Sequence, residues 1–286
     1  MTIALGLIGH TGMVFAADTE ESWGNDIKTA TTKLISGSRV VTGGAPLCSI
    51  CVTGSGNSDY LDAVKMDLIY STLLDAKWRY ELTADLCEAF LVRFYEKHVV
   101  PFWPNIEDFQ LVIGINTEKQ GALWGTSKAA MRPCMYGFEA TGLGRPYASA
   151  LLSRFHSVTL DLNACAMLAI HVICCVKEFI GGCGKQTQIV VLSGGDNWVI
   201  DQDVVDEAER ILKRVFRLDS ALMHFLLSEQ ETPTFESIQK EAFSLKAKLR
   251  SLDLLSRRVQ PSHLVTKVDP QSPPPSQDSH GGSGES

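Results

Sequence analysis

Residues 1–24 read MTIALGLIGHTGMVFAADTEESWG, and this stretch decides how the chain begins to fold. Two β-prone runs, residues 2–9 and 13–18, flank a short His-Thr-Gly turn, which is typical of a β-hairpin. The stretch lacks the pattern of a secretory signal, because no Lys or Arg precedes Lys28 and a Gly-containing turn breaks the apolar run. We therefore expect the fold to begin at this hairpin and the protein to be cytoplasmic.

Strand-like and helix-like segments then follow in groups. The strand-like runs cover residues 39–44, 46–54, 109–116, 121–127, 134–142, 187–196 and 197–201. The helical patterns cover residues from 58 onward, 83–100, 146–155 and 160–180. Strands grouped in this way, with pairs of helices between the groups, predict an α+β fold. We expect a four-layer αββα sandwich, in which two antiparallel sheets lie between helix pairs.

The chain changes character after Asp203, and we divide it there. Residues 1–203 form the predicted main domain, 204–268 a C-terminal helical extension, and 269–286 a disordered tail of polar residues and proline. Helices are expected over residues 204–218, continuing toward 227, and from the Thr232-Pro233 pair onward. The last helix carries an apolar stripe that packs either on its own domain or on another subunit, formed by Ile238, Ala242, Leu245, Leu249 and Leu252.

Composition excludes several classes of function. The chain has 286 residues and a net charge of −7, so nucleic acid and anionic membrane surfaces are not expected partners. Its longest apolar run, residues 164–176 apart from His171, is too short to span a bilayer. Cys48 and Cys51 have CxxC spacing, but they lie in a strand-like run that turns them to opposite faces. We therefore expect neither a metal nor a redox site there.

The opening stretch also contains candidates for catalysis. Removal of Met1 would leave Thr2 with a free α-amine, so that one residue carries both a nucleophilic hydroxyl and a base. A nearby lysine lowers the pKa of such an amine by like-charge repulsion, and a carboxylate holds the lysine in place. Asp18 ends the second strand of the hairpin, and Lys33 lies in the following β-prone run, TTKLI. Hairpin geometry can bring Thr2, Asp18 and Lys33 together.

Each of these residues has a simpler interpretation as well. Asp18 alternatively caps a turn at the end of its strand. Lys33 alternatively is a solvated lysine on an edge strand, where it discourages aggregation. His10 in the turn and His171 in the apolar helix have no evident pairing, so both are expected to be structural.

Three segments resemble the proteasome β-subunits and related bacterial ring proteases, which are N-terminal nucleophile hydrolases. The first is the opening stretch with TTKLI and CSICVTGSGNSDYLD, the second ATGLGRPYASALL, and the third CVKEFIGGCGKQTQIVVLSGGDNWV. The resemblance covers about residues 1–203. It implies the sandwich fold, peptide-bond hydrolysis without a metal or cofactor, and assembly into homo-oligomeric rings.

The resemblance also implies roles for individual residues. Thr2 matches the nucleophile and base, Asp18 the carboxylate that orders the lysine, and Lys33 the lysine that lowers the amine pKa. The glycine-rich turn matches the source of the oxyanion-hole amide, which we assign to Gly54, with Ser55 and Gly56 as alternatives.

The chain also departs from the family pattern around the terminal amine. Glu178 stands where the family has Asp, Leu143 where it has Ser between two glycines, and Gly181 where it has a further Ser. The hydrogen-bonded shell around the amine is therefore altered, with Glu178 as its remaining ionisable member. The residues after Asp18 are Thr19-Glu20-Glu21, acidic where the family often has a basic residue.

These observations predict a threonine-type hydrolase that cleaves a peptide or protein substrate through an ester on Thr2. The resemblance allows for an ATP-dependent unfoldase as a partner, but the sequence does not identify one. Two alternatives remain open. One is a catalytically silent scaffold subunit, and the other is an amidase that acts on a small non-peptide amide. Cleavage specificity and ring stoichiometry are not fixed by the sequence.

Overall fold

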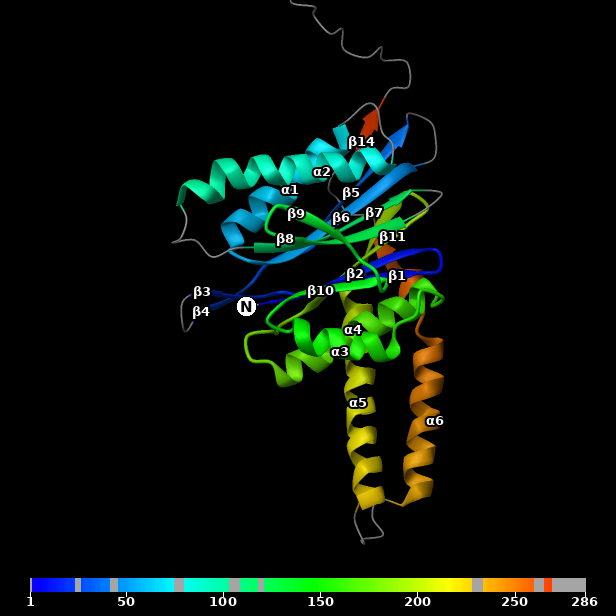
Figure 1. The fold of residues 1–286 in the computed structure, drawn as a ribbon. Coiled ribbons are helices and arrows are strands. Elements are labelled where there is room, and N and C mark those ends of the chain that lie inside the picture. The colour runs from blue at the N-terminus through cyan, green and yellow to red at the C-terminus, as the bar shows by residue number, and fades with distance from the viewer. Residues whose placement is uncertain are drawn as a thin grey trace, which may run out of the picture.

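The computed structural model describes residues 2–23, 27–41, 46–74, 80–102, 109–117, 121–227, 234–259 and 265–268. Two six-stranded sheets lie face to face, with one pair of helices above and another below (Figure 1). The predicted four-layer αββα sandwich is confirmed. The sheets are antiparallel except at the edge strand β14, which pairs in parallel with β5.

The first sheet is built on the N-terminal hairpin, as the opening stretch predicts. Its strand order is β10-β1-β2-β11-β12-β13. The hairpin strands pair from Gly9 opposite Gly12 to Ala4 opposite Ala17, and β11 pairs along the other side of β2. The bounds are β1 (Ile3–Gly9), β2 (Gly12–Asp18), β10 (Phe138–Gly142), β11 (Thr187–Ser193), β12 (Asp196–Ile200) and β13 (Arg258–Val259).

The second sheet has the order β14-β5-β6-β7-β8-β9. Its longest strand, β6, pairs with β5 on one side and with β7 on the other. The bounds are β5 (Ile35–Val41), β6 (Pro46–Gly56), β7 (Phe109–Thr117), β8 (Gly121–Ser127), β9 (Ala130–Pro133) and β14 (Val265–Val268). A separate two-stranded sheet, β3 (Glu20–Trp23) with β4 (Ile27–Ala30), was not predicted.

The helices cover the outer faces of the two sheets. On the second sheet lie α1 (Ser58–Leu74) and α2 (Tyr80–Phe94), and α2 passes into a π-helical turn (Tyr95–Val99) and a 3-10 turn (Val100–Phe102). On the first sheet lie α3 (Arg145–Phe155) and α4 (Leu162–Phe179). Asp161 caps α4, since its side chain accepts from the Ala164 amide at 2.7 Å.

Alternation along the strands separates three apolar cores. In β1 and β2, the side chains of Ile3, Leu5 and Val14 face α3 and α4, whereas Met13 and Phe15 face the other sheet. The same alternation in β6 places Cys48 against α1 and α2 and Cys51 between the sheets, as predicted. Both thiols are free.

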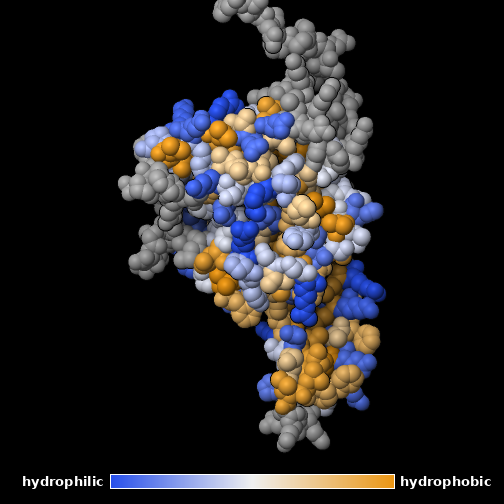
Figure 2. All heavy atoms as spheres, in the orientation of Figure 1, coloured by the Kyte–Doolittle hydropathy of each residue, from blue (hydrophilic) through white to orange (hydrophobic). Residues whose placement is uncertain are grey.

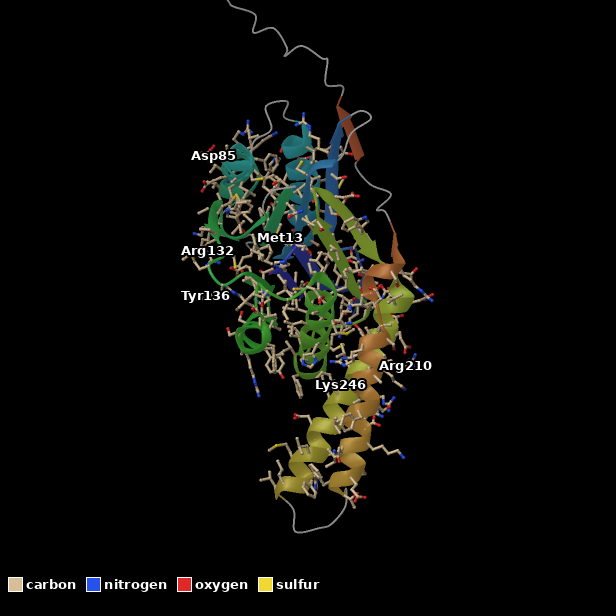
Figure 3. All side chains as sticks on the ribbon, turned by 90° about the vertical axis from the view of Figure 1, so that its right-hand side faces the viewer. Met13, Asp85, Arg132, Tyr136, Arg210 and Lys246 are labelled. Atoms are coloured by element: carbon tan, nitrogen blue, oxygen red, sulfur yellow. The ribbon has the colours of Figure 1, made fainter. Side chains whose placement is uncertain are left out.

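The C-terminal helices form a hairpin that projects from the sandwich. It consists of α5 (Gln202–Leu227) and α6 (Phe235–Ser251), followed by a 3-10 turn (Leu254–Arg257). Figure 3 shows the two helices side by side, with Arg210 on α5 and Lys246 on α6, while Met13 lies inside the sandwich. The helix α6 begins two residues after the predicted Thr232-Pro233 start, because Thr234 is its cap, with Oγ1 accepting from the Ser237 amide.

The stripe on α6 packs mainly on its own chain. Ile238 and Leu245 are buried, and Leu249 and Leu252 contact the core beneath α4, whereas Ala242 is exposed. Packing on its own domain, the first of the two predicted alternatives, therefore accounts for four of the five residues of the stripe. The predicted disordered tail, residues 269–286, lies outside the described residues.

The core helix α4 lies within the predicted helix over residues 160–180 and is longer than the apolar run 164–176 at its centre. With 18 residues, it is long and apolar enough to cross a membrane by length and composition alone, and it is the one such helix among the described residues. The predicted helix therefore has nearly the observed bounds, whereas the apolar run alone underestimated the length that is apolar enough to span a bilayer. In the structure its apolar residues pack against β1, β2 and α5, and ten of them are buried.

Candidate active site

The side chains of Thr2, Asp18 and Lys33 meet at the N-terminal end of β1. The Lys33 ammonium donates to Thr2 Oγ1 at 2.7 Å and to Asp18 Oδ1 at 2.9 Å. All three residues are buried, with Asp18 fully so. A charge is rarely buried without a partner, and here each ionised group has an opposite charge within hydrogen-bond distance. The structure therefore brings together the three residues named from the sequence.

The hairpin and the chain that follows it place these groups. Thr2 precedes β1, and Asp18 is the last residue of β2. Asp18 Oδ1 also accepts from the Ile3 amide at 3.0 Å, so the carboxylate is tied to the strand that carries Thr2. Lys33 was expected within a β-prone run. It lies instead in the connector between β4 and β5, where its carbonyl accepts from Thr53 Oγ1 at 3.1 Å.

A segment before and within β11 supports both charged residues. The Gly184 amide donates to Asp18 Oδ2 at 2.9 Å, and the Lys33 amide donates to Gln188 Oε1 at 3.0 Å. Sequence reasoning did not identify Gly184 or Gln188. A glycine-rich turn and a glutamine at the start of a strand are common features, and no local signal relates them to residues more than 150 positions earlier.

Burial sets the electrostatics of the lysine. Desolvation lowers the pKa of Lys33 below its usual 10.5, and the Asp18 carboxylate opposes this effect. The ammonium has three acceptors, since it also donates to the Glu20 carbonyl at 2.5 Å. The buried Cys183 lies close enough to interact with these charges, and burial raises its pKa to about 11, so its thiol is protonated at neutral pH.

The amide of Gly54 points away from β7. The Leu111 amide donates to Thr126 Oγ1 on β8, so alternation along β7 turns the amide of Gln110 toward β6. Gln110 is paired with Ser55, which therefore directs its own amide toward β7. The amide of the preceding residue, Gly54, faces the opposite side, toward β5.

The strand β5 ends before it reaches this amide. The ladder between β5 and β6 stops at the pair Ile35 and Val52, two residues before Gly54. The Gly54 amide therefore lies beyond the last strand pair on that side, near the connector that carries Lys33. A Cβ on Gly54 would lie 2.5 Å from the Gln110 carbonyl oxygen of β7 and 2.8 Å from the Leu61 side chain of α1, so a side chain is excluded at this position.

A polar group lies on the other side of Thr2. Ser55 Oγ and Thr141 Oγ1 are 2.6 Å apart, and Thr141 Oγ1 donates to Gln110 Oε1 at 3.1 Å. The next residue, Gly142, has φ +96°, and a Cβ there would collide with the Thr2 carbonyl oxygen and lie 3.3 Å from Ser55 Cβ. Close packing against Gly142 thus fixes the backbone of Thr2.

The structure does not add Glu178 to this group. Its side chain is exposed at the end of α4, and no hydrogen bond or ion pair joins it to another described residue. Leu143 is 52% exposed, and a Cβ on Gly181 would meet nothing within 4 Å. None of the three supplies a polar contact to Thr2, and the contacts to Asp18 and Lys33 come from Gly184 and Gln188 instead.

The arrangement can perform nucleophilic chemistry. A hydroxyl lies against an ammonium that a buried carboxylate holds, and a strand-end amide without a strand partner lies nearby. Among the described residues, no group of three or more His, Cys, Asp or Glu side chains is placed to hold a metal ion.

Comparison with known proteins finds similarity at the level of structure. No model of a protein family matches the sequence, and no curated protein matches it. A mutant of Anbu from Hyphomicrobium sp. strain MC1 superposes with a TM-score of 0.65 at 18% identity, covering 80% of this chain and 99% of that one.

Anbu from Pseudomonas aeruginosa, described in a helical assembly, gives a TM-score of 0.61 at 15% identity, covering 82% of this chain and 99% of that one. Anbu from Yersinia bercovieri, described as an ancestral beta-subunit, gives 0.61 at 13% identity, covering 80% and 99%. At these identities the similarity shows a shared fold.

Proposed function

We propose that the protein is a threonine-type hydrolase that cleaves peptide bonds, with Thr2 as its nucleophile after removal of Met1. One observation carries the proposal: the Lys33 ammonium lies 2.7 Å from Thr2 Oγ1 and 2.9 Å from Asp18 Oδ1. A lysine that merely discouraged edge pairing would be solvated, but this one is buried. The fold shared with an ancestral beta-subunit supports the same reading.

In the first half of the reaction, Thr2 Oγ1 attacks the carbonyl carbon of the substrate while the α-amine of Thr2 accepts the hydroxyl proton. The Lys33 ammonium repels a second positive charge and so lowers the pKa of the amine toward neutrality. Asp18 keeps Lys33 in place and charged. The tetrahedral intermediate then collapses, the amine returns the proton to the leaving nitrogen, and an ester remains on Thr2.

In the second half, the α-amine accepts a proton from water, and the resulting hydroxide attacks the ester carbon. Collapse of the second intermediate releases the acid and restores the Thr2 hydroxyl. Both intermediates carry a negative oxygen, for which the Gly54 amide is the proposed donor, because it faces the side where β5 has ended. One such donor is typically worth about 2.7–4 kcal/mol of transition-state stabilisation.

We further propose that the chain works as a homo-oligomer in the cytoplasm. The helical assembly described for the Pseudomonas aeruginosa neighbour supports self-association of this fold. A closed assembly that hid Thr2 would admit only unfolded chains, so an ATP-dependent unfoldase is the class of partner proposed to supply substrate.

The test is intact mass spectrometry with an epoxyketone, which reacts with a terminal threonine through both its hydroxyl and its amine. We expect the protein to lack Met1 and to gain one adduct on Thr2. A peptide panel run in parallel should show hydrolysis that the epoxyketone abolishes. Native mass of the same sample reports the oligomeric state.

Two variants serve as controls, and both have a small second residue that allows removal of Met1. Thr2→Ala should lose the adduct and the hydrolysis, whereas Thr2→Ser should keep both. Retention of Met1, or an adduct that persists in Thr2→Ala, would contradict the proposal and favour a silent scaffold. An adduct on Thr2 with no peptide cleavage would favour an amidase for small amides.

A further inference from the structure

The segment 184–188 holds both charged partners of Thr2. It donates from the Gly184 amide to Asp18 Oδ2 at 2.9 Å and accepts from the Lys33 amide at Gln188 Oε1 at 3.0 Å. A shift of this segment would therefore move the carboxylate and the lysine relative to the nucleophile. What fixes the segment bears directly on the reactivity of Thr2.

The same segment is also tied to the chain immediately after Asp18. The Thr19 amide donates to the Gln186 carbonyl at 3.0 Å, and the Gln186 amide donates to Thr19 Oγ1 at 3.0 Å. In the ladder between β2 and β11, Thr187 stands directly opposite Asp18. Any displacement of Thr187 is thus passed to Asp18 through adjacent hydrogen bonds.

A cluster of three side chains, Lys177, Thr187 and Glu209, anchors the segment from the far side. The Lys177 ammonium donates to Glu209 Oε1, to Thr187 Oγ1 and to the Lys185 carbonyl, each at 2.7 Å. Thr187 Oγ1 in turn donates to Glu209 Oε1 at 2.5 Å. This anchor cluster joins the end of α4, the start of β11 and the first turns of α5.

The anchor cluster is suited to fixing geometry. The Lys177 and Glu209 side chains are each 13% exposed, so the pair is mostly desolvated. Such a pair gains little net stability over apolar residues, but loss of one member leaves an unpaired charge in a poor solvent. The three donors of the ammonium all have acceptors, so Lys177 has one well-defined position.

We propose that the anchor cluster is a positioning device for the active site, through which α5 sets the place of Asp18 and Lys33. The inference rests on the proposed hydrolase function and extends it. It makes α5 a working part of the site, although the sequence divides the chain at residue 203. Lys177 and Glu209 act through the segment 184–188 and need not touch substrate.

The test compares Lys177→Met, Lys177→Arg and Glu209→Gln with Arg214→Met. Arg214 lies on α5, as Glu209 does, and also makes an ion pair, at 2.6 Å from Glu241. Its partner is on α6, so it makes no bond to the segment 184–188. Each variant is measured for the rate of epoxyketone labelling against pH and for unfolding in urea. The pKa of Lys33 is followed by NMR of its side chain.

We expect Lys177→Met to label about 10- to 100-fold more slowly at neutral pH, the size of effect that a misplacement of about 1 Å produces. Its labelling should need higher pH, because the Thr2 amine loses part of the repulsion that lowers its pKa. Lys33 should show a lower pKa than in the natural chain, because its distance to Asp18 increases. In Lys177→Arg the labelling profile and the pKa of Lys33 should be close to those of the natural chain, and Arg214→Met should change neither of these two quantities.

Several outcomes separate the possibilities. Equal pH profiles and equal Lys33 titration in Lys177→Met and Arg214→Met would overturn the inference, even if Lys177→Met were less stable. If Lys177→Met does not fold, the same comparison is made between Glu209→Gln and Arg214→Met. Glu209→Gln keeps an acceptor for Lys177 and Thr187 but removes the negative charge. If the natural chain is not labelled at all, the proposed function fails, and the titration of Lys33 alone tests the positioning role.

Discussion

At the scale of single residues, the buried pair of Asp18 and Lys33 is the most consequential interaction. Both charges are desolvated, and each has the other as an opposite charge at 2.9 Å in addition to its neutral hydrogen-bond partners. Removing one partner leaves a buried charge, which typically costs about 3–5 kcal/mol, whereas removing both does not. The pair should therefore show strong energetic coupling.

We predict that Lys33→Met and Asp18→Asn each lower the free energy of unfolding by about 3 kcal/mol. The double variant should be at least about 1 kcal/mol more stable than the sum of the two single losses in unfolding free energy predicts. Urea unfolding of the natural chain, the two single variants and the double variant at neutral pH measures this double-mutant cycle. Additive effects would mean that Asp18 is held by the Ile3 and Gly184 amides and not by the lysine.

The three residues of the site could be named from sequence, but their supports could not. A terminal threonine, a strand-end aspartate and a lysine are chemically suggestive at short sequence separation. Gly184 and Gln188 reach Asp18 and Lys33 only because β11 pairs with β2, and this pairing joins residues about 170 positions apart. Glu178 was named from a resemblance to a motif, and in the structure its side chain points to solvent.

At the scale of elements, the end of β10 fixes the backbone of Thr2. Gly142 has φ +96°, which costs a residue with a Cβ roughly 1–3 kcal/mol, and the Cβ would also strike the Thr2 carbonyl oxygen. We predict that Gly142→Ala destabilises the fold by more than about 2 kcal/mol and abolishes labelling of Thr2. Gly181→Ala is the matched control, because a Cβ there meets nothing within 4 Å.

The control should unfold within about 0.5 kcal/mol of the natural chain. Urea unfolding and epoxyketone labelling are measured on both variants. Normal labelling in Gly142→Ala would show that the packing of β10 against Thr2 is not needed for the site.

The core helix α4 carries a histidine whose burial makes stability depend on pH. His171 lies between the rings of Phe155 and Phe216, its Nδ1 is buried with no described partner, and burial lowers its pKa below 6.5. The unfolded chain therefore binds a proton more readily than the folded one. As pH falls below 6.5 toward the lowered pKa, the folded state loses stability.

We predict that His171→Phe removes this loss while retaining the aromatic contacts. Unfolding in urea at pH 7.5 and pH 5 measures it, since the natural chain should lose more stability than the variant between the two. A larger loss of stability in His171→Phe than in the natural chain would mean that the imidazolium has a partner in the folded state. The nearest candidate is the Cys175 sulfur, 3.7 Å from Nε2.

Elements with a clear period could be predicted, and irregular ones could not. The hairpin, α1, α4 and most strands of both sheets follow from runs of matching hydrophobic period, whereas the short strands β9 and β13 lie outside every predicted run. The small β3–β4 sheet and the parallel edge strand β14 depend on strand pairing, and the π-helical turn after α2 is a local irregularity; none of the three has a distinct period in the sequence. Lys33 was expected in a β-prone run, but only Ile35 of TTKLI is paired in a strand, and residues 31–34 precede β5.

At the scale of the whole molecule, the hairpin of α5 and α6 has two different parts. Near the sandwich its apolar residues join the core of the first sheet. Farther out, apolar side chains remain exposed, as the orange lower part of Figure 2 shows, among them Met223, Leu226, Leu227, Phe235 and Phe243. The sequence showed that these helices are amphipathic, but it could not show where the core ends along them.

Two neighbouring residues of α6 test this division. Leu245 is 2% exposed and Phe243 is 62% exposed, so their side chains differ in burial although they lie two positions apart. Leu245→Ala should lower the free energy of unfolding by about 2–5 kcal/mol, because it leaves a cavity at a buried position of the helical hairpin. Phe243→Ala should stay within about 0.5 kcal/mol of the natural chain if its ring faces only water.

Urea unfolding and native mass, measured together, separate the two roles that the outer part of the hairpin can have. Equal native mass for Phe243→Ala and the natural chain would leave the hairpin a projection that is stabilised only at its base. A smaller mass with unchanged stability of the single chain would mean that Phe243 contacts another copy. A loss of several kcal/mol in Phe243→Ala, without a change in mass, would contradict the burial on which this comparison depends.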